Sequence, residues 1–339
     1  MSARARIAVL VAALGACAVP PEQEPTASEL VAVTFELDQP EPEPVNPPRD
    51  DEIVVCGERI PIGTRVVLWS EPGGYDAYST ELRFPLEAPK EPPEGLRYQP
   101  GRRAGGVEVP GAANASCRAD LERVLEQFVL HYDVCGTSRQ CFKILHDRRG
   151  LSVHFLLDLD GTLYQTLDLC ETAWHARQAN ARSVGIEIAN IGAYRPGATT
   201  LGEWYVRDES GPRVQLPAWM AESGVRKSEF VARPARSEPV RGEIHGAEVE
   251  MFDLTREQYD ALVALTAALC RTFPRLEPDA PRGMDGCVRR DVLSDDEFAS
   301  FRGVLGHYHV TRDKIDPGPA FDWEGFLERV HATLARAEP

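Results

Sequence analysis

The sequence predicts an α/β fold, with a mixed central β-sheet flanked by helices on both faces. Two observations lead to this prediction. Short runs rich in Val, Ile, Leu and Phe alternate along residues 116–335 with segments whose apolar residues recur at helical spacing. Three of the helical segments start at a Ser or Thr that precedes a Glu or Gln by three residues, which is the pattern of a capping box. With 339 residues, the chain is long enough for one large domain or two small ones.

The first 17 residues have the pattern of an export signal. Two arginines, Arg4 and Arg6, precede an apolar run over 7–14 that is too short to span a bilayer as a helix. The next residues, LGAC, are similar to the lipobox of bacterial lipoproteins, in which the signal is cut before a cysteine that becomes lipidated. We therefore expect an exported lipoprotein, anchored through Cys17 on the periplasmic side of the outer membrane. An ordinary signal peptide cut nearby is the alternative.

Residues 18–50 are expected to form a disordered linker, because eight prolines are mixed there with glutamates and few aromatic residues. The linker carries much of the net charge of −16, and an acidic chain is a poor partner for nucleic acid. Residues 51–115 form an N-terminal extension with two short β-type runs, 53–55 and 65–69. We expect the extension to pack on the main domain. A separate small module is the alternative, although so short a stretch is little for an independent core.

Glycines, prolines and capping signals divide the main domain, residues 116–335, into elements. Asp160-Gly161, between two apolar runs, is a strong hairpin signal. Residues 191–250 contain several glycines and prolines and no sustained period, and we expect an insertion there. The expected elements are, in order, helix 118–126, strand 127–133, a helix from Thr137 toward Arg148, strands 153–157 and 162–166, strand 183–190, helix 255–272, a short helix over 294–301, strand 303–307 and helix 323–336.

The segment 306–318, GHYHVTRDKIDPG, supplies a histidine, a lysine and an aspartate within a dozen residues. A zinc hydrolase needs three protein ligands and an open position for water. His307 and Asp316 can give two of the ligands, and His131, at the end of a predicted strand, is the best candidate for the third. His309 is the main rival to His307, because an HxH pair on an extended strand points both rings to one face.

Five pieces of the chain carry a family resemblance: FVLHYD, SVHFLLDLDGTLYQ, AWHARQAN, SVGIEIAN and GHYHVTRDKIDPGPAFDW. In this order they resemble the zinc-dependent N-acetylmuramoyl-L-alanine amidases of the amidase-2 family, which also contains the peptidoglycan recognition proteins. The resemblance covers residues 116–330 and implies the fold of that family, here with an N-terminal extension and an insertion. It also implies a zinc (Zn²⁺) cofactor, peptidoglycan or muropeptides as partner, and hydrolysis of the amide bond between N-acetylmuramic acid and L-alanine.

The resemblance implies roles for the residues around the metal. His131, His307 and Asp316 match the ligand positions of the family, and the ligand directly follows a glycine, which favours His307 over His309. Lys314 is expected to face the oxyanion that forms on the amide carbonyl. A fixed donor of this kind contributes roughly 3–4 kcal/mol to transition-state stabilisation. A surface lysine is the alternative.

Glu187 is the expected proton-transfer residue. Recognition-protein members of the family use a tyrosine two residues before the phenylalanine that matches Phe155, and Val153 stands there in this chain. Another branch places a glutamate in a Gly-Ile-Glu strand, which matches Glu187. The alternative is a solvated strand residue. His154, His175 and Asn180 match positions that line the family's groove, where they would contact substrate or support the ligands.

Seven cysteines remain after Cys17, and an exported chain can form disulfides. Peptidoglycan recognition proteins carry a disulfide with the spacing and position of Cys135 and Cys141, and we expect that pair here. A Cys270–Cys287 pair is only a guess from their proximity in sequence.

Two other functions stay open at this point. A non-catalytic peptidoglycan-binding protein would usually lack a full ligand set. A zinc peptidase that cuts within the stem peptide would use the same site chemistry, and only the whole-fold resemblance argues against it. The aromatic residues Trp204, Tyr205 and Trp219 of the insertion could stack on sugars, but the simpler interpretation is that they pin the insertion to the domain.

Overall fold

The structure is a computed structural model that describes residues 50–87, 89–111, 115–220 and 222–336. The predicted export signal with Cys17 and nearly all of the predicted linker lie outside the described residues. Within the described ranges, no helix has both the length and the apolar character needed to cross a membrane.

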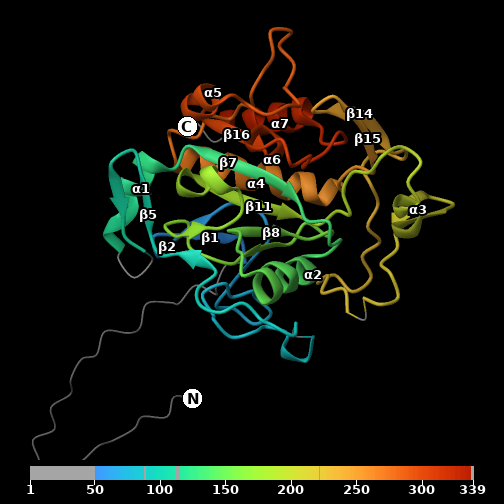
Figure 1. The fold of residues 1–339 in the computed structure, drawn as a ribbon, viewed down its shortest axis with the longest axis horizontal. Coiled ribbons are helices and arrows are strands. Elements are labelled where there is room, and N and C mark those ends of the chain that lie inside the picture. The colour runs from blue at the N-terminus through green and yellow to red at the C-terminus, as the bar shows by residue number, and fades with distance from the viewer. Residues whose placement is uncertain (1–49, 88, 112–114, 221, 337–339) are drawn as a thin grey trace, which may run out of the picture. The chain divides into compact units, whose positions relative to one another are not determined.

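A six-stranded mixed sheet forms the centre of the fold (Figure 1), which confirms the predicted fold class. Neighbouring strands are parallel, except for β8 and β9, which form the antiparallel hairpin predicted around Asp160-Gly161. The central strands are rich in Val, Ile and Leu and buried, as expected for parallel strands covered on both faces. In spatial order the strands are β16 (Gly303–Gly306), β7 (Gln127–Tyr132), β11 (Ser183–Ile188), β8 (Phe155–Leu157), β9 (Leu163–Gln165) and β3 (Val66–Leu68).

One face of the sheet packs against two long helices, α4 (Arg256–Thr272) and α7 (Trp323–Ala335). Leu130 and Ile186 of the central strands belong to this core. Helix α4 begins where the sequence predicts, because Thr255 and Gln258 form both hydrogen bonds of a capping box.

The other face packs against α2 (Ser138–Phe142), which continues as a π-helix over Lys143–Arg149. Leu156 of β8 and Phe142 of α2 share the core on this side. Side chains alternate along a strand. Each residue next to one that faces α4 therefore directs its side chain toward α2. His131 is such a residue, so the sheet presents it on the α2 side.

The N-terminal extension is built into this fold. Its strand β3 is the edge of the central sheet and pairs in parallel with β9. The remaining strands of the extension form short antiparallel pairs, one of them with the main domain. These pairs are β1 (Glu52–Val55) with β2 (Glu58–Pro61), β4 (Tyr98–Gln99) with β10 (Thr172–Ala173), and β5 (Arg102–Ala104) with β6 (Val107–Val109).

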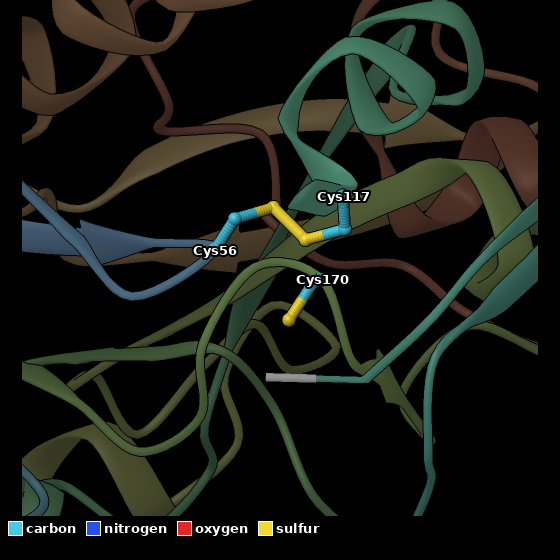
Figure 2. A group of neighbouring side chains, drawn as sticks. All are labelled: Cys56, Cys117 and Cys170. Atoms are coloured by element: carbon cyan, nitrogen blue, oxygen red, sulfur yellow. A yellow bond between two sulfur atoms is a disulfide. The ribbon is translucent and has the colours of Figure 1, made fainter. Parts of the chain in front are cut away.

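A disulfide joins Cys56 of the extension to Cys117, which directly precedes α1 (Arg118–Val124). Figure 2 shows the free thiol of Cys170 beside this bond, and the three sulfur atoms lie within 4.8 Å of one another. Cys170 comes from the loop between β9 and β10, so three segments that are distant in sequence meet at this point.

The expected pairs Cys135–Cys141 and Cys270–Cys287 are not formed in the structure, where all four cysteines are free. Cys135 and Cys141 do lie together, with sulfur atoms within 4.8 Å, but no covalent bond joins them. The spacing therefore indicated proximity correctly, whereas covalent pairing does not follow from spacing.

Residues 191–250 contain helix α3 (Thr200–Trp204) and two hairpins. Trp204 is buried, and Tyr205 packs on Phe252 with ring centroids 4.1 Å apart, so both aromatic side chains hold the segment to the domain. Trp219, in contrast, is 64% exposed. The hairpins are β12 (Tyr205–Asp208) with β13 (Gly211–Val214), and β14 (Val240–Ile244) with β15 (Ala247–Met251).

Candidate active site

Three predicted ligands meet at the carboxyl ends of two adjacent parallel strands. His131 is near the end of β7, and His307 directly follows β16 as the first residue of α6 (His307–Val310). The Nδ1 atoms of His131 and His307 are 2.9 Å apart. Oδ2 of Asp316 lies 2.9 Å from the first of these nitrogens and 3.0 Å from the second. All three side chains are buried.

This group fits a zinc ion. Ligand atoms at zinc distances of about 2.0–2.1 Å in a tetrahedron are about 3.3 Å apart, so the three atoms need to separate by only a few tenths of an ångström. Burial, followed by the charge of His307, lowers the pKa of His131 to about 4, which keeps its imidazole neutral and able to bind a metal. Burial would raise the pKa of Asp316, but the two histidines outweigh burial and hold this pKa below its usual range.

His309 does not compete for the metal. The predicted strand over 303–307 ends at Gly306 and α6 begins at His307, so the extended geometry assumed for an HxH pair is absent. The Nδ1 atom of His309 accepts the Gly306 N–H at 2.9 Å, and its Nε2 lies 2.8 Å from the carbonyl oxygen of Arg289. Both ring nitrogens are therefore used in holding the turn.

Glu187 lies beside the metal group. It pairs in register with His131 across the parallel strands β11 and β7, so the two side chains point to the same face. Burial, followed by the charge of Asp316, raises the pKa of Glu187 well above its usual value, and Lys314 acts in the opposite direction. Within the described ranges, no hydrogen bond or ion pair involves the Glu187 carboxylate.

His175 contacts a proposed ligand from outside the metal group. Its Nδ1 lies 3.0 Å from Nε2 of His131, and its Nε2 lies 3.2 Å from Oγ of Ser183. The side-chain oxygen of Asn180 accepts the N–H groups of His175 at 3.2 Å and of Ala176 at 2.6 Å. His175 and Asn180 thus form a support for His131, which is one of the two roles expected for them.

His154 is fully buried, so the prediction of a substrate contact for it is wrong. Its side chain is 0% exposed. Its Nδ1 accepts the Gly185 N–H at 3.1 Å, and its Nε2 lies 3.1 Å from the carbonyl oxygen of Glu171. Burial lowers the pKa of His154 to about 3, so it is a neutral core residue that joins β11 to a neighbouring loop.

Arg102 is a residue of this region that the sequence did not reveal. It lies in the Pro- and Gly-rich part of the extension and is buried against the loop that carries Asn180. The sequence gives no pattern from which the burial of Arg102 could be predicted, because its partners are distant. They are backbone carbonyls about 70–80 residues away in sequence and the ring of His154, 52 residues away, whose Nε2 lies 2.8 Å from Nη2 of Arg102.

Comparisons with known proteins give one family match and several similar solved structures. Residues 122–319 match the family model Amidase_2, N-acetylmuramoyl-L-alanine amidase. No curated protein sequence matches the chain significantly.

Several solved structures are similar to the chain, among them the following three. The first is the amidase AmiD from E. coli in complex with anhydro-N-acetylmuramic acid-L-Ala-D-γ-Glu-L-Lys, at 16% identity and a TM-score of 0.35, with coverage of 60% of this chain and 57% of that one. The endolysin LysCS from Clostridium intestinale has 16% identity, a TM-score of 0.34 and coverage of 62% and 86%. An AmpD structure has 18% identity, a TM-score of 0.32 and coverage of 72% and 94%. The chain thus spans little more than half the length of the AmiD structure.

Proposed function

Since the chain belongs to the Amidase_2 family of N-acetylmuramoyl-L-alanine amidases, we propose that it hydrolyses the amide bond between N-acetylmuramic acid and L-alanine in peptidoglycan or muropeptides, with zinc as cofactor. The observation that carries this proposal is the buried group of His131, His307 and Asp316 next to Glu187. Two imidazoles and one carboxylate form a typical catalytic zinc set, which leaves a position for water.

In the proposed mechanism His131, His307 and Asp316 hold the zinc. Bound zinc would lower the pKa of a water molecule and polarise the amide carbonyl. Glu187 accepts the proton of the attacking water and passes it to the nitrogen of the departing L-alanine. Burial and the charge of Asp316 raise its pKa, which favours the protonated form that carries the proton between the two steps.

Lys314 completes the proposed machinery. It is partly buried in the loop between α6 and Asp316, and its charge acts on both Glu187 and His131. An ammonium group there can face the negative charge that develops on the amide oxygen. Removal of one such donor typically reduces turnover about 10²–10³-fold.

We also propose that the protein is a lipoprotein on the periplasmic side of the outer membrane. The proposal is based on the basic and apolar residues that precede Cys17. Cells fed labelled palmitate should yield a labelled membrane-bound protein, and Cys17→Ala should abolish the label. An unlabelled, soluble wild-type protein would contradict the proposal.

The test of the function is mass spectrometry of purified muropeptides incubated with residues 51–339, with and without a chelator. We expect release of an intact stem peptide from the sugar, loss of this activity with chelator and its return with zinc. A shortened stem peptide would instead identify a peptidase. Retained but uncleaved substrate would identify a binding protein.

A further inference from the structure

Arg102, in strand β5 of the N-terminal extension, lies outside the residues that match the family and yet is only 1% exposed. Its guanidinium donates to four backbone carbonyls of the main domain. These are Leu169 at 2.8 Å, Ser183 at 2.9 Å, Asn180 at 3.1 Å and Ala181 at 3.3 Å. A buried charge is costly unless such hydrogen bonds compensate it, so these contacts fix the loop over 180–183 firmly.

Two short routes lead from these carbonyls to His175. In the first, Arg102 holds the backbone of Ser183, whose hydroxyl lies 3.2 Å from Nε2 of His175. In the second, Arg102 holds the backbone of Asn180, whose side chain accepts the N–H of His175. Arg102 therefore fixes both the ring and the backbone of His175.

His175 in turn fixes the ring of His131. A metal bound to Nδ1 of His131 requires the hydrogen of that ring to be on Nε2, which lies 3.0 Å from Nδ1 of His175. Nε2 of His131 then donates to His175, and Nε2 of His175 donates to the hydroxyl of Ser183. Partners of this kind set the orientation of a metal-binding imidazole, and their loss typically weakens metal affinity about 10–100-fold.

Other contacts of the extension hold the same region. Strand β4 pairs with β10, two residues before His175. The Gly101 N–H donates to Glu171 at 2.7 Å, and the Thr172 hydroxyl donates to the Gly101 carbonyl at 2.7 Å. The Cys56–Cys117 disulfide lies beside Cys170 in the same loop (Figure 2). The extension thus holds the segment that ends at His175 through strand pairing and hydrogen bonds.

We propose that Arg102 is a positioning residue of the catalytic centre, which acts through the 180–183 loop and His175 on His131. The N-terminal extension is then an integral part of the enzyme. The inference rests on the proposed function in that it takes His131 as a metal ligand.

The test uses Arg102→Lys and Arg102→Met in the full chain. The matched control is Arg97→Lys, because Arg97 is likewise buried, at 0% exposure, and also comes from the extension. It donates instead to the carbonyls of Pro93, Gly95 and His146. The measurements are amide hydrogen exchange of residues 175–185 in metal-free protein, the visible spectrum of the cobalt-substituted protein, zinc affinity, and kcat and KM.

We expect faster exchange in residues 175–185, an altered cobalt spectrum and zinc affinity reduced about 10–100-fold for both Arg102 variants, and none of these changes for Arg97→Lys. The value of kcat should fall more than KM rises, because substrate is not contacted. The proposal is overturned if the Arg102 variants lose only thermal stability, as the control does.

A second variant keeps the proposal testable if the Arg102 variants do not fold. Ser183→Ala removes the partner of His175 while leaving Arg102 in place. We expect the same change in the cobalt spectrum, and an unchanged spectrum would overturn the proposal. Hydrogen exchange and cobalt spectra do not require cleavage of muropeptides, so a wild-type protein without amidase activity would refute the proposed function separately.

Discussion

Glu187 and His131 lie directly opposite each other in adjacent parallel strands, β11 and β7. Backbone pairing therefore sets the separation between the proposed proton carrier and a proposed metal ligand. Rigid strands position side chains more precisely than loops do. This pairing therefore suits a site in which a proton must move over a short distance. A substitution at Glu187 can separate the two roles.

Glu187→Gln should retain zinc and lose about 10²–10⁴-fold in turnover, because the amide cannot carry the proton but preserves the shape of the side chain. The measurement combines kcat on a muropeptide with the zinc content of the purified variant. Loss of the metal would instead place Glu187 among the ligands, and unchanged turnover would require a different base.

Zinc should raise the thermal stability of the metal-free protein, because it binds the folded chain through three residues that come together only on folding. At 100-fold excess over the dissociation constant, the gain is about 2.7 kcal/mol, which corresponds to several degrees in Tm. Asp316→Asn should lose most of this increase. An equal increase in that variant would show that zinc binds elsewhere.

The parts of the fold that depend on local sequence were predictable. Thr255 and Ser294 begin their helices as expected, because a capping box is made within four consecutive residues. The meeting of His131, His307 and Asp316 was also predictable, since these residues lie in segments that resemble a known family. Here the sequence carries the information directly.

The features that the sequence did not predict share a physical cause. In each of them, the deciding contacts come from distant segments of the chain. His154 is removed from the groove by partners in other segments of the chain. Cys56 pairs with a cysteine 61 residues away, and no spacing rule identifies this partner. The burial of Arg102 could not be predicted for the same reason, because its hydrogen bonds are made to backbone carbonyls that the sequence does not identify.

Removing the Cys56–Cys117 disulfide by a double substitution to serine should lower the free energy of unfolding by about 2–4 kcal/mol, because the bond closes a loop with a sequence separation of 61 residues. Denaturant unfolding of both proteins measures the difference. Peptide mapping of alkylated wild-type protein should find the label on Cys170. A peptide that links Cys170 to either partner would contradict the pairing.

Asp158 should make stability depend on pH. Burial raises the pKa of its carboxyl to about 7. The hydrogen bond from the Leu159 N–H acts in the opposite direction and lowers the pKa. Between its unfolded value of 3.8 and 7, the folded chain binds more protons, so stability falls as pH rises through this window, by at most about 4 kcal/mol. Asp158→Asn should therefore be more stable than wild type at pH 8, with the difference shrinking toward pH 4. A constant difference would contradict this assignment.

Gly185→Ala should lower zinc affinity and kcat, although it replaces no proposed metal ligand. A Cβ atom at Gly185 would lie 2.5 Å from Nδ1 of His175, so either the ring or strand β11 must shift. If the ring moves, it loses its contact with His131, and both zinc affinity and kcat should fall by about tenfold or more.

The matched control is Gly202→Ala, because Gly202 lies inside helix α3 and a Cβ there meets no atom within 4 Å. In a helix interior this change is expected to be neutral or to stabilise by up to about 1 kcal/mol. Isothermal titration with zinc and steady-state kinetics compare the two variants. Full zinc affinity in Gly185→Ala, with only lowered thermal stability, would mean that the strand yields and that His131 keeps its orientation without the help of His175.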